Sequence, residues 1–213
     1  MAKSGDIESE LRERIAGHDL LPGTKLKETA LAEEFGVSRA RIRQAFTHLE
    51  QRGLVERVHN YGTRVAIPDA KEIFAIYDVF ELLEGLCVRL AVQNAPDDRW
   101  DDLHRLFGPE LKETVAAGDC ETLFAAIMTY RRRTQVAADN PTLNNFLESI
   151  YDKTQMIIRR TLILPGRAEQ SYGEHVAIIA AMREGDAEKA EALKRANMRT
   201  AREFLQRYQA FIL

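Results

Sequence analysis

The chain has 213 residues, 45 % of them apolar and 30 % charged, with a formal net charge of −3. This composition is typical of a globular protein of one large or two small domains, and it gives no overall sign of a polyanion-binding protein. Its two cysteines are too few for a disulfide framework or a zinc-finger spacing, no apolar run approaches the roughly 20 residues that span a bilayer, and the first residues lack the apolar core of a signal peptide. We therefore expect a cytoplasmic protein without membrane contact.

The first part of the chain predicts two short helices before a tight turn. In "ESELRERIAG" the residues Leu11 and Ile15 face inward and Gly17 closes the helix. A connection, "LLPGTKL", leads to a second helix over residues 29–35, and Gly36-Val37 supplies the turn that follows it. This order is typical of a helix-turn-helix.

Positive charge gathers directly after this turn. Residues 36–64 hold six basic and two acidic side chains, a local balance of +4 in a net-acidic protein. Ser38 is a good N-cap, and from it Ile42, Ala45, Phe46 and Leu49 fall at the spacing of one buried helical face. The three arginines at positions 39, 41 and 43 then crowd a helix N-terminus, which favours anions and can present side chains to base edges.

Two strands are predicted next, over residues 54–58 and 63–67. The segment His59-Asn60-Tyr61-Gly62 joins them and contains the turn formers Asn and Gly. Three helices followed by a hairpin predict a winged helix-turn-helix over residues 1–68, with Pro68-Asp69 ending the wing.

The run "LLPGTKLKETALAEEFGVSRARIRQAFTHLEQRGLVERVHNYGTRV" resembles the N-terminal domain of GntR-family bacterial transcription regulators. Its motifs occur in the family's order: Pro-Gly, Leu-Ala, Gly-Val-Ser-Arg, x-Arg-x-Ala, Gly-Leu-Val and the Gly-x-x-Val of the wing. The resemblance implies that this part binds DNA. The predicted DNA-contacting residues are Thr29, Ser38, Arg39, Ala40, Arg41, Arg43, Gln44, His59, Asn60, Tyr61 and Gly62.

One residue of this run departs from the family. Position 41 is often proline there and is Arg41 here, so an extra cation is expected to alter site preference. For Arg41, Arg52 or Arg57 taken alone, a solvated surface charge remains the alternative.

Residues 69–213 predict an all-helical domain of about six helices. The breakers are Asn94 to Asp97, Gly108-Pro109, Gly118-Asp119, Asp139-Asn140-Pro141, Pro165-Gly166 and Gly185-Asp186. The first helix carries an apolar stripe of Ile73, Ile76, Phe80, Leu83, Cys87 and Leu90. The predicted fold is therefore mainly α, a winged helix-turn-helix followed by a bundle that can bury its own core.

The segments "IYDVFELLEGLCVRLA", "TYRRRTQVAADNPTL" and "SYGEHVAIIAAMREGDAEKAEALKRANMRTAREFL" resemble the effector-binding FCD-type domain of the FadR subgroup of GntR regulators. Members of the subgroup often hold a divalent metal with an Asp-x3-His pair and two further histidines. Counted through that pattern, the four ligand positions are Ile127, Arg131, His175 and Asn197. Because a metal normally needs three or four N, O or S donors, we expect no metal and no cofactor. The first helix of this domain also departs from the subgroup's pattern. It has Phe80 where many relatives have arginine, near the retained Glu84.

The polar residues among these positions are predicted to face inward. His175 shares a helical face with Ile178, Ile179 and Met182, and Asn197 interrupts an apolar stripe. Buried polar groups need partners, and a small bound ligand is one. The predicted effector-binding residues are Arg131, His175, Asn197, Ile127, Tyr130 and Gln155. Two alternatives stay open: the polar groups satisfy one another, or Arg131 belongs with Arg132 and Arg133 to a solvated charge run.

These observations predict a transcription regulator, not an enzyme, that binds an inverted-repeat operator as a homodimer and responds to a small metabolite. The expected metabolite is a carboxylate, because the forked guanidinium of Arg131 suits one. By resemblance, the expected action is repression relieved by the metabolite. The alternatives are a DNA-binding dimer that senses nothing and a helical-bundle metalloenzyme. The enzyme would need paired Glu-x-x-His or similar clusters on facing helices, which "GEH" with the lone His175 does not supply.

Overall fold

The computed structural model describes residues 4–17, 19–67, 69–95 and 100–212. By their contacts these residues form one compact unit made mainly of the chain up to Asp69 and a second made mainly of the helices from Ala70 onward. Pro68 at the predicted domain boundary and Pro96-Asp97 in the first predicted breaker lie outside the described residues. The boundary between residues 68 and 69 stays a prediction.

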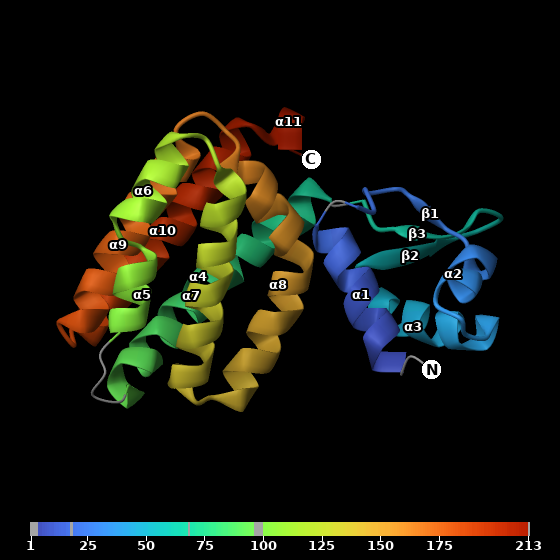
Figure 1. Cartoon of the computed structure of the whole chain (residues 1–213), viewed down its shortest axis with the longest axis horizontal. Coiled ribbons are helices and arrows are strands. Elements are labelled where there is room, and N and C mark those ends of the chain that lie inside the picture. Colours follow the sequence, from blue (N-terminus) through green and yellow to red (C-terminus); the bar gives the residue numbers. More distant parts are fainter. Residues whose placement is uncertain (1–3, 18, 68, 96–99, 213) are drawn as a thin grey trace. The chain divides into compact units, whose positions relative to one another are not determined.

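The first unit is a winged helix-turn-helix, as predicted (Figure 1). Two of its strands, β2 and β3, pair as an antiparallel hairpin with Val58 opposite Gly62. A third strand, β1, pairs with the other side of β3, so the strand order is β1-β3-β2. This strand lies at the end of the "LLPGTKL" connection, and the sequence did not predict it. The elements are α1 (Ser4–Ala16), β1 (Lys25–Leu26), α2 (Glu28–Glu34), α3 (Arg39–Gln51), β2 (Val55–Val58) and β3 (Gly62–Val65).

The turn between α2 and α3 is held by backbone geometry. Gly36 has a φ of +65°, a conformation that strains residues with a Cβ, and the Val37 N–H donates to the Ala32 carbonyl at 3.0 Å. Ser38 is the N-cap of α3, as predicted, although its side chain makes no capping hydrogen bond. The four apolar residues predicted to face inward from α3 are at most 1 % exposed, so the opposite face of α3, with its arginines, points to solvent.

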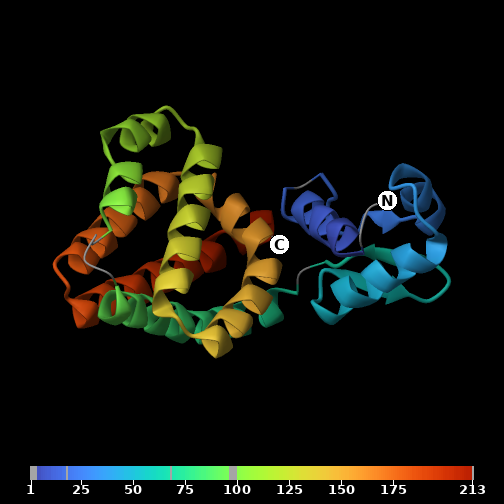
Figure 2. The same ribbon diagram turned by 60° about the horizontal axis from the view of Figure 1, so that its bottom comes forward.

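The second unit is all-helical (Figure 2). The predicted breakers fall at helix ends, and three of them supply N-caps: Asp119, Asn140 and Asp186 each accept a hydrogen bond from a backbone N–H of the following turn. The described residues form eight helices rather than about six. They are α4 (Ala70–Asn94), α5 (Asp101–Leu106), α6 (Pro109–Ala116), α7 (Cys120–Ala138), α8 (Pro141–Leu162), α9 (Arg167–Arg183), α10 (Ala187–Arg207) and α11 (Gln209–Ile212).

Helix α4 is the scaffold of this unit, since it packs most extensively on α10 and also on α7, while α9 packs on α10. Its buried face is turned slightly from the predicted stripe. Ile73, Phe80 and Cys87 are buried as expected, but Tyr77 and Glu84 are buried with them. The other three predicted stripe residues, Ile76, Leu83 and Leu90, are only half-buried. A carboxylate therefore sits on the core face of α4. None of the described helices is long and apolar enough to cross a membrane.

The close approach of α4 and α10 depends on Gly85. A Cβ at this position would lie 2.6 Å from Cγ of Arg195 and 3.2 Å from Cγ of Glu191. Gly173, in α9, is also helical, but a Cβ there would meet nothing within 4 Å. The two glycines thus provide a matched pair for testing the packing.

We expect Gly85→Ala to lower the free energy of unfolding by about 1 kcal/mol, because overpacking of roughly 1–3 kcal/mol exceeds the gain of up to about 1 kcal/mol from helix propensity. Gly173→Ala should raise it by up to about 1 kcal/mol, since only the propensity changes. Urea unfolding followed by circular dichroism measures both. Equal stabilisation by the two variants would show that α4 and α10 do not meet at Gly85.

Candidate functional site

Five of the eleven predicted DNA-contacting residues line one groove on the first unit. An open groove runs between the N-terminal turn of α3 and the wing, and it is lined in part by Thr29, Arg39, Arg43, Asn60 and Gly62. The remaining predicted residues do not line this groove. They are Ser38, Ala40, Gln44, His59 and Tyr61, which are exposed, and Arg41, which is half-exposed.

Three basic residues that the prediction did not include also line the groove: Lys25 on β1, Lys27 before α2, and Arg57 on β2. The ammonium of Lys25 lies 4.5 Å from the ring centroid of Tyr61 at the wing tip. Their basic character is visible in the sequence, but the pairing of β1 with β3 is what brings Lys25 to the wing. The groove is thus more basic than α3 alone.

The carboxylate of Glu28 faces two of the three arginines of α3, Arg39 and Arg43. Oε2 of Glu28, in the first turn of α2, lies 3.5 Å from Nη2 of Arg39 and 3.7 Å from Nη1 of Arg43. Both arginine side chains are more than half exposed, so these are loose, solvent-screened ion pairs. A phosphate or a base edge that binds either arginine must therefore compete with the carboxylate of Glu28.

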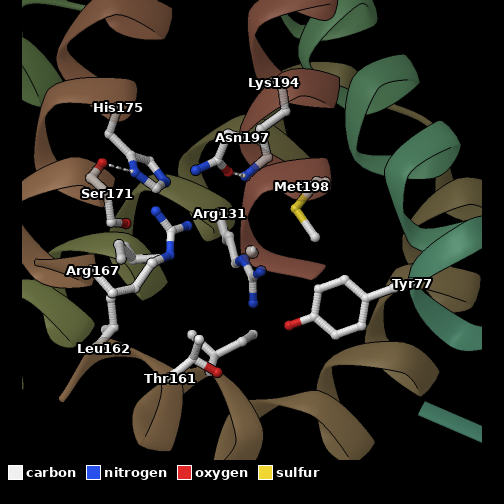
Figure 3. A pocket seen from close by; sticks show the side chains of 13 residues that line it. Tyr77, Arg131, Thr161, Leu162, Arg167, Ser171, His175, Lys194, Asn197 and Met198 are labelled. Carbon is white, nitrogen blue, oxygen red and sulfur yellow. Dashed lines mark hydrogen bonds between the residues drawn. The ribbon is translucent and has the colours of Figure 1, made fainter. Parts of the chain in front are cut away.

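The second unit contains a cavity between its helices (Figure 3). Its volume is about 30 Å³, room for about two water molecules. The predicted residues Ile127 and Arg131 from α7, His175 from α9 and Asn197 from α10 all line it. The four positions of the subgroup's metal pattern are therefore brought together in this chain, although three of them carry other side chains.

Sequence reasoning missed several residues of the cavity. Lys194 and Met198 line it from α10, Arg167 and Ser171 from α9, and Tyr77 from α4. Lys194 is three residues before Asn197 and four after the buried Ala190, so helical spacing could have indicated its burial. The positive charge of Lys194, however, favoured the prediction of a solvent-exposed side chain.

Two predicted effector residues do not line the cavity. Tyr130 is fully buried beside it, where its ring meets that of His175 edge-on at 5.2 Å between centroids. Gln155 is half-buried on α8 and is absent from the lining. Neighbouring helix positions point about 100° apart, so spacing alone did not orient these two side chains. Their contact with an effector stays a prediction.

Charged groups in the cavity are arranged around two carboxylates. Glu84, from α4, lies 2.8 Å from Nζ of Lys194 and 3.7 Å from Nε of Arg131. Glu174 accepts from Nη1 of Arg167 at 2.9 Å and from Nδ2 of Asn197 at 2.6 Å. Burial lowers the pKa of Lys194, and the charge of Glu84 opposes that shift.

The side chain of Arg131 belongs to the interior rather than to a surface charge run. It is 5 % exposed and lies over the ring of Phe80, 5.1 Å from Cζ to the ring centroid, whereas Arg132 is exposed. The aromatic residue that replaces the subgroup's arginine on α4 thus supports the cation on α7 through a cation–π contact.

His175 is neutral in this environment. Its side chain is buried, and its Nδ1 lies 2.8 Å from the carbonyl oxygen of Ser171. Burial, and then the positive charge of Lys194, hold the pKa of His175 well below its ordinary value. Among the described residues, no three or more of His, Cys, Asp and Glu gather in a group that could hold a metal ion.

Comparison with known proteins assigns the two units separately. Residues 3–65 match the GntR family of bacterial regulatory proteins, and residues 75–200 match the FCD domain. The chain is 30 % identical to the uncharacterised HTH-type transcriptional regulator YdhC of Bacillus subtilis (strain 168), over 86 % of this chain and 82 % of that one. It is 29 % identical to a protein of Paenarthrobacter nicotinovorans named "Probable D-xylose utilization operon transcriptional repressor", over 83 % and 77 % of the two chains.

Among solved structures, Escherichia coli McbR/YncC superimposes with a TM-score of 0.81 over 98 % of this chain and 100 % of that chain, at 20 % identity. At this identity the likeness shows the fold. The matching families and relatives are transcription regulators and not enzymes.

The geometry at Glu28 predicts opposite effects of two substitutions. Glu28→Gln should tighten binding to any DNA duplex about two- to fivefold, because it removes a carboxylate that competes for Arg39 and Arg43. Arg43→Ala should weaken binding by roughly 1–3 kcal/mol. Fluorescence anisotropy with a duplex selected from a random pool and with an unselected duplex, at several salt concentrations, measures both. Weaker binding by Glu28→Gln would mean that the carboxylate positions the arginines instead.

The residues at the four metal-pattern positions predict a metal-free protein. Ile127 offers no donor atom, Arg131 is cationic, and Asn197 is engaged with Glu174 and Lys194. Purified protein should carry no stoichiometric transition metal by mass spectrometry, and a chelator should leave its melting temperature unchanged. About one zinc or nickel per chain that is lost on His175→Ala would show a different ligand set.

Proposed function

Because the chain belongs to the GntR family of bacterial regulatory proteins and carries an FCD domain, we propose that it is a transcription repressor controlled by a small carboxylate metabolite. The metabolite binds in the cavity of the helical bundle and lowers the affinity for the operator. The protein acts in the cytoplasm, where its DNA lies.

The observation that carries this proposal is the excess of positive charge in the cavity. Of its described lining residues, Arg131, Arg167 and Lys194 are cationic, while their partners Glu84 and Glu174 supply two negative charges. With His175 neutral, these groups sum to +1 in a site shielded from water. A single carboxylate neutralises that charge, and a buried guanidinium binds it in a forked geometry.

The size of the cavity supports a coupling between ligand and conformation. A volume of about 30 Å³ holds water but is too small for a metabolite of several carbons. Such a ligand enters only if side chains such as Arg131 move, and the helices α7, α9 and α10 that carry the lining then repack. A ligand that binds one arrangement better than another shifts operator affinity by linkage.

The DNA-binding unit supports a homodimer on an inverted repeat. One recognition helix reads only a few base pairs, and two-fold symmetry doubles the site. Repression is proposed as the mode of action because the relative from Paenarthrobacter nicotinovorans is named as a repressor.

A second candidate function is a DNA-binding dimer that senses nothing. The small volume of the cavity favours it, because a packed interior with its charges mutually paired needs no ligand. A thermal-shift screen of carboxylates separates the two, since a ligand at 100 times its dissociation constant stabilises the protein by about 2.7 kcal/mol.

For a carboxylate found by that screen, Arg131→Ala should abolish release from the operator while leaving DNA binding of the ligand-free protein intact. Arg131→Lys keeps the positive charge but loses the paired N–H donors of the guanidinium, so the carboxylate should release the operator only weakly. Arg132→Ala is the matched control, because Arg132 is the next residue in the chain and its side chain is exposed. Anisotropy with labelled operator and titrated carboxylate measures release, and circular dichroism checks folding.

An Arg131→Ala protein that is folded and still releases DNA at wild-type carboxylate concentrations would remove Arg131 from the site. A screen in which no carboxylate raises the melting temperature would favour the non-sensing dimer.

A further inference from the structure

We propose that the cavity selects a carboxylate that also carries a hydroxyl group, and that Nε2 of His175 accepts the hydrogen bond of this hydroxyl. The inference rests on the proposed function, because it names the ligand class of the same cavity.

The hydrogen bond of His175 to the backbone defines its tautomer. Nδ1 lies 2.8 Å from the carbonyl oxygen of Ser171. A carbonyl oxygen can only accept, so Nδ1 carries the hydrogen. In a neutral ring Nε2 then has no hydrogen and presents a lone pair. His175 therefore offers an acceptor, not a donor, at its second nitrogen.

The ring is held in this orientation from two sides. Phe107 stacks on it with centroids 5.4 Å apart and an angle of 16° between the planes, and Tyr130 meets it edge-on. His175 as a residue is 2 % exposed, and its Nε2 has no hydrogen-bond partner among the described residues. A buried acceptor without a donor costs free energy, and turning the ring would break the bond to Ser171.

The direction of this acceptor points to the ligand. His175 lines the cavity, and in Figure 3 the ring nitrogen that is not bonded to Ser171 lies on the side of the other labelled cavity residues. A carboxylate can satisfy the cations but has no hydrogen to donate to Nε2. A hydroxyl group has one. An amino group would also donate, but as an ammonium it is repelled by Arg131, Arg167 and Lys194, so a hydroxy acid fits better than an amino acid.

The test uses pairs of carboxylates that differ only in hydroxyl groups: glycolate and acetate, lactate and propionate, 3-hydroxybutyrate and butyrate, malate and succinate, gluconate and hexanoate. Calorimetric titration of the full-length protein should show the hydroxylated member of at least one pair binding at least tenfold more tightly. His175→Phe keeps a ring against Phe107 but lacks the acceptor, and it should reduce that ratio to about one. His104→Phe, at an exposed histidine, should leave it unchanged.

Different failures identify which idea is wrong. Equal affinity within a pair whose members both release the operator would overturn the hydroxyl inference and leave the proposed function standing. A panel in which no member binds would overturn both. Nitrogen-15 NMR of the ligand-free protein gives an independent reading: His175 should carry its hydrogen on Nδ1, and a hydrogen on Nε2 would overturn the inference without any ligand.

Discussion

Glu84, Lys194 and Arg131 meet inside the helical bundle with side chains that are at most 5 % exposed. Taking such charges out of water is unfavourable, and their mutual attraction only roughly offsets it, so apolar residues of similar volume would serve stability as well or better. Loss of one partner would leave a buried charge uncompensated. The three side chains come from α4, α10 and α7, so the arrangement of these helices and the charge of the cavity depend on the same contacts. The cluster therefore adds little net stability to the bundle.

The two arginines of the DNA-binding unit that face Glu28 are exposed to water, unlike the charged side chains of the cavity. Arg39 and Arg43 are more than half exposed, and their separations from Glu28 are long for ion pairs. Water and salt screen such pairs, so they add little to folding. The same exposure leaves the guanidinium groups available to an incoming phosphate. In this unit an apolar core formed by α1, α2, α3 and the sheet stabilises the fold, and the exposed charges are available for binding.

The cavity illustrates how one scaffold can host different chemistry. Ile127, Arg131, His175 and Asn197 occupy the positions of the subgroup's metal pattern, and they do surround a common cavity. The four residues thus meet as the resemblance implies, but only His175 is of a residue type that the pattern uses. Where relatives would use a metal ion, this chain places side-chain cations whose charge is partly offset by Glu84 and Glu174. Function therefore has to be argued from these side chains rather than from the fold alone.

Local features of the sequence were sufficient to predict much of the fold. The spacing of Ile42, Ala45, Phe46 and Leu49 determined the buried face of α3, and Asn140 and Asp186 marked helix starts, because periodicity and capping act within a few residues. The two-residue strand β1 has no periodicity of its own and exists only through its pairing with β3. From the sequence alone Lys194 is expected at the surface. Its charge can be buried because it pairs with Glu84, which lies on another helix. The rings that hold His175 were likewise decided by tertiary structure, since Phe107 and Tyr130 come from separate segments that no local pattern aligns.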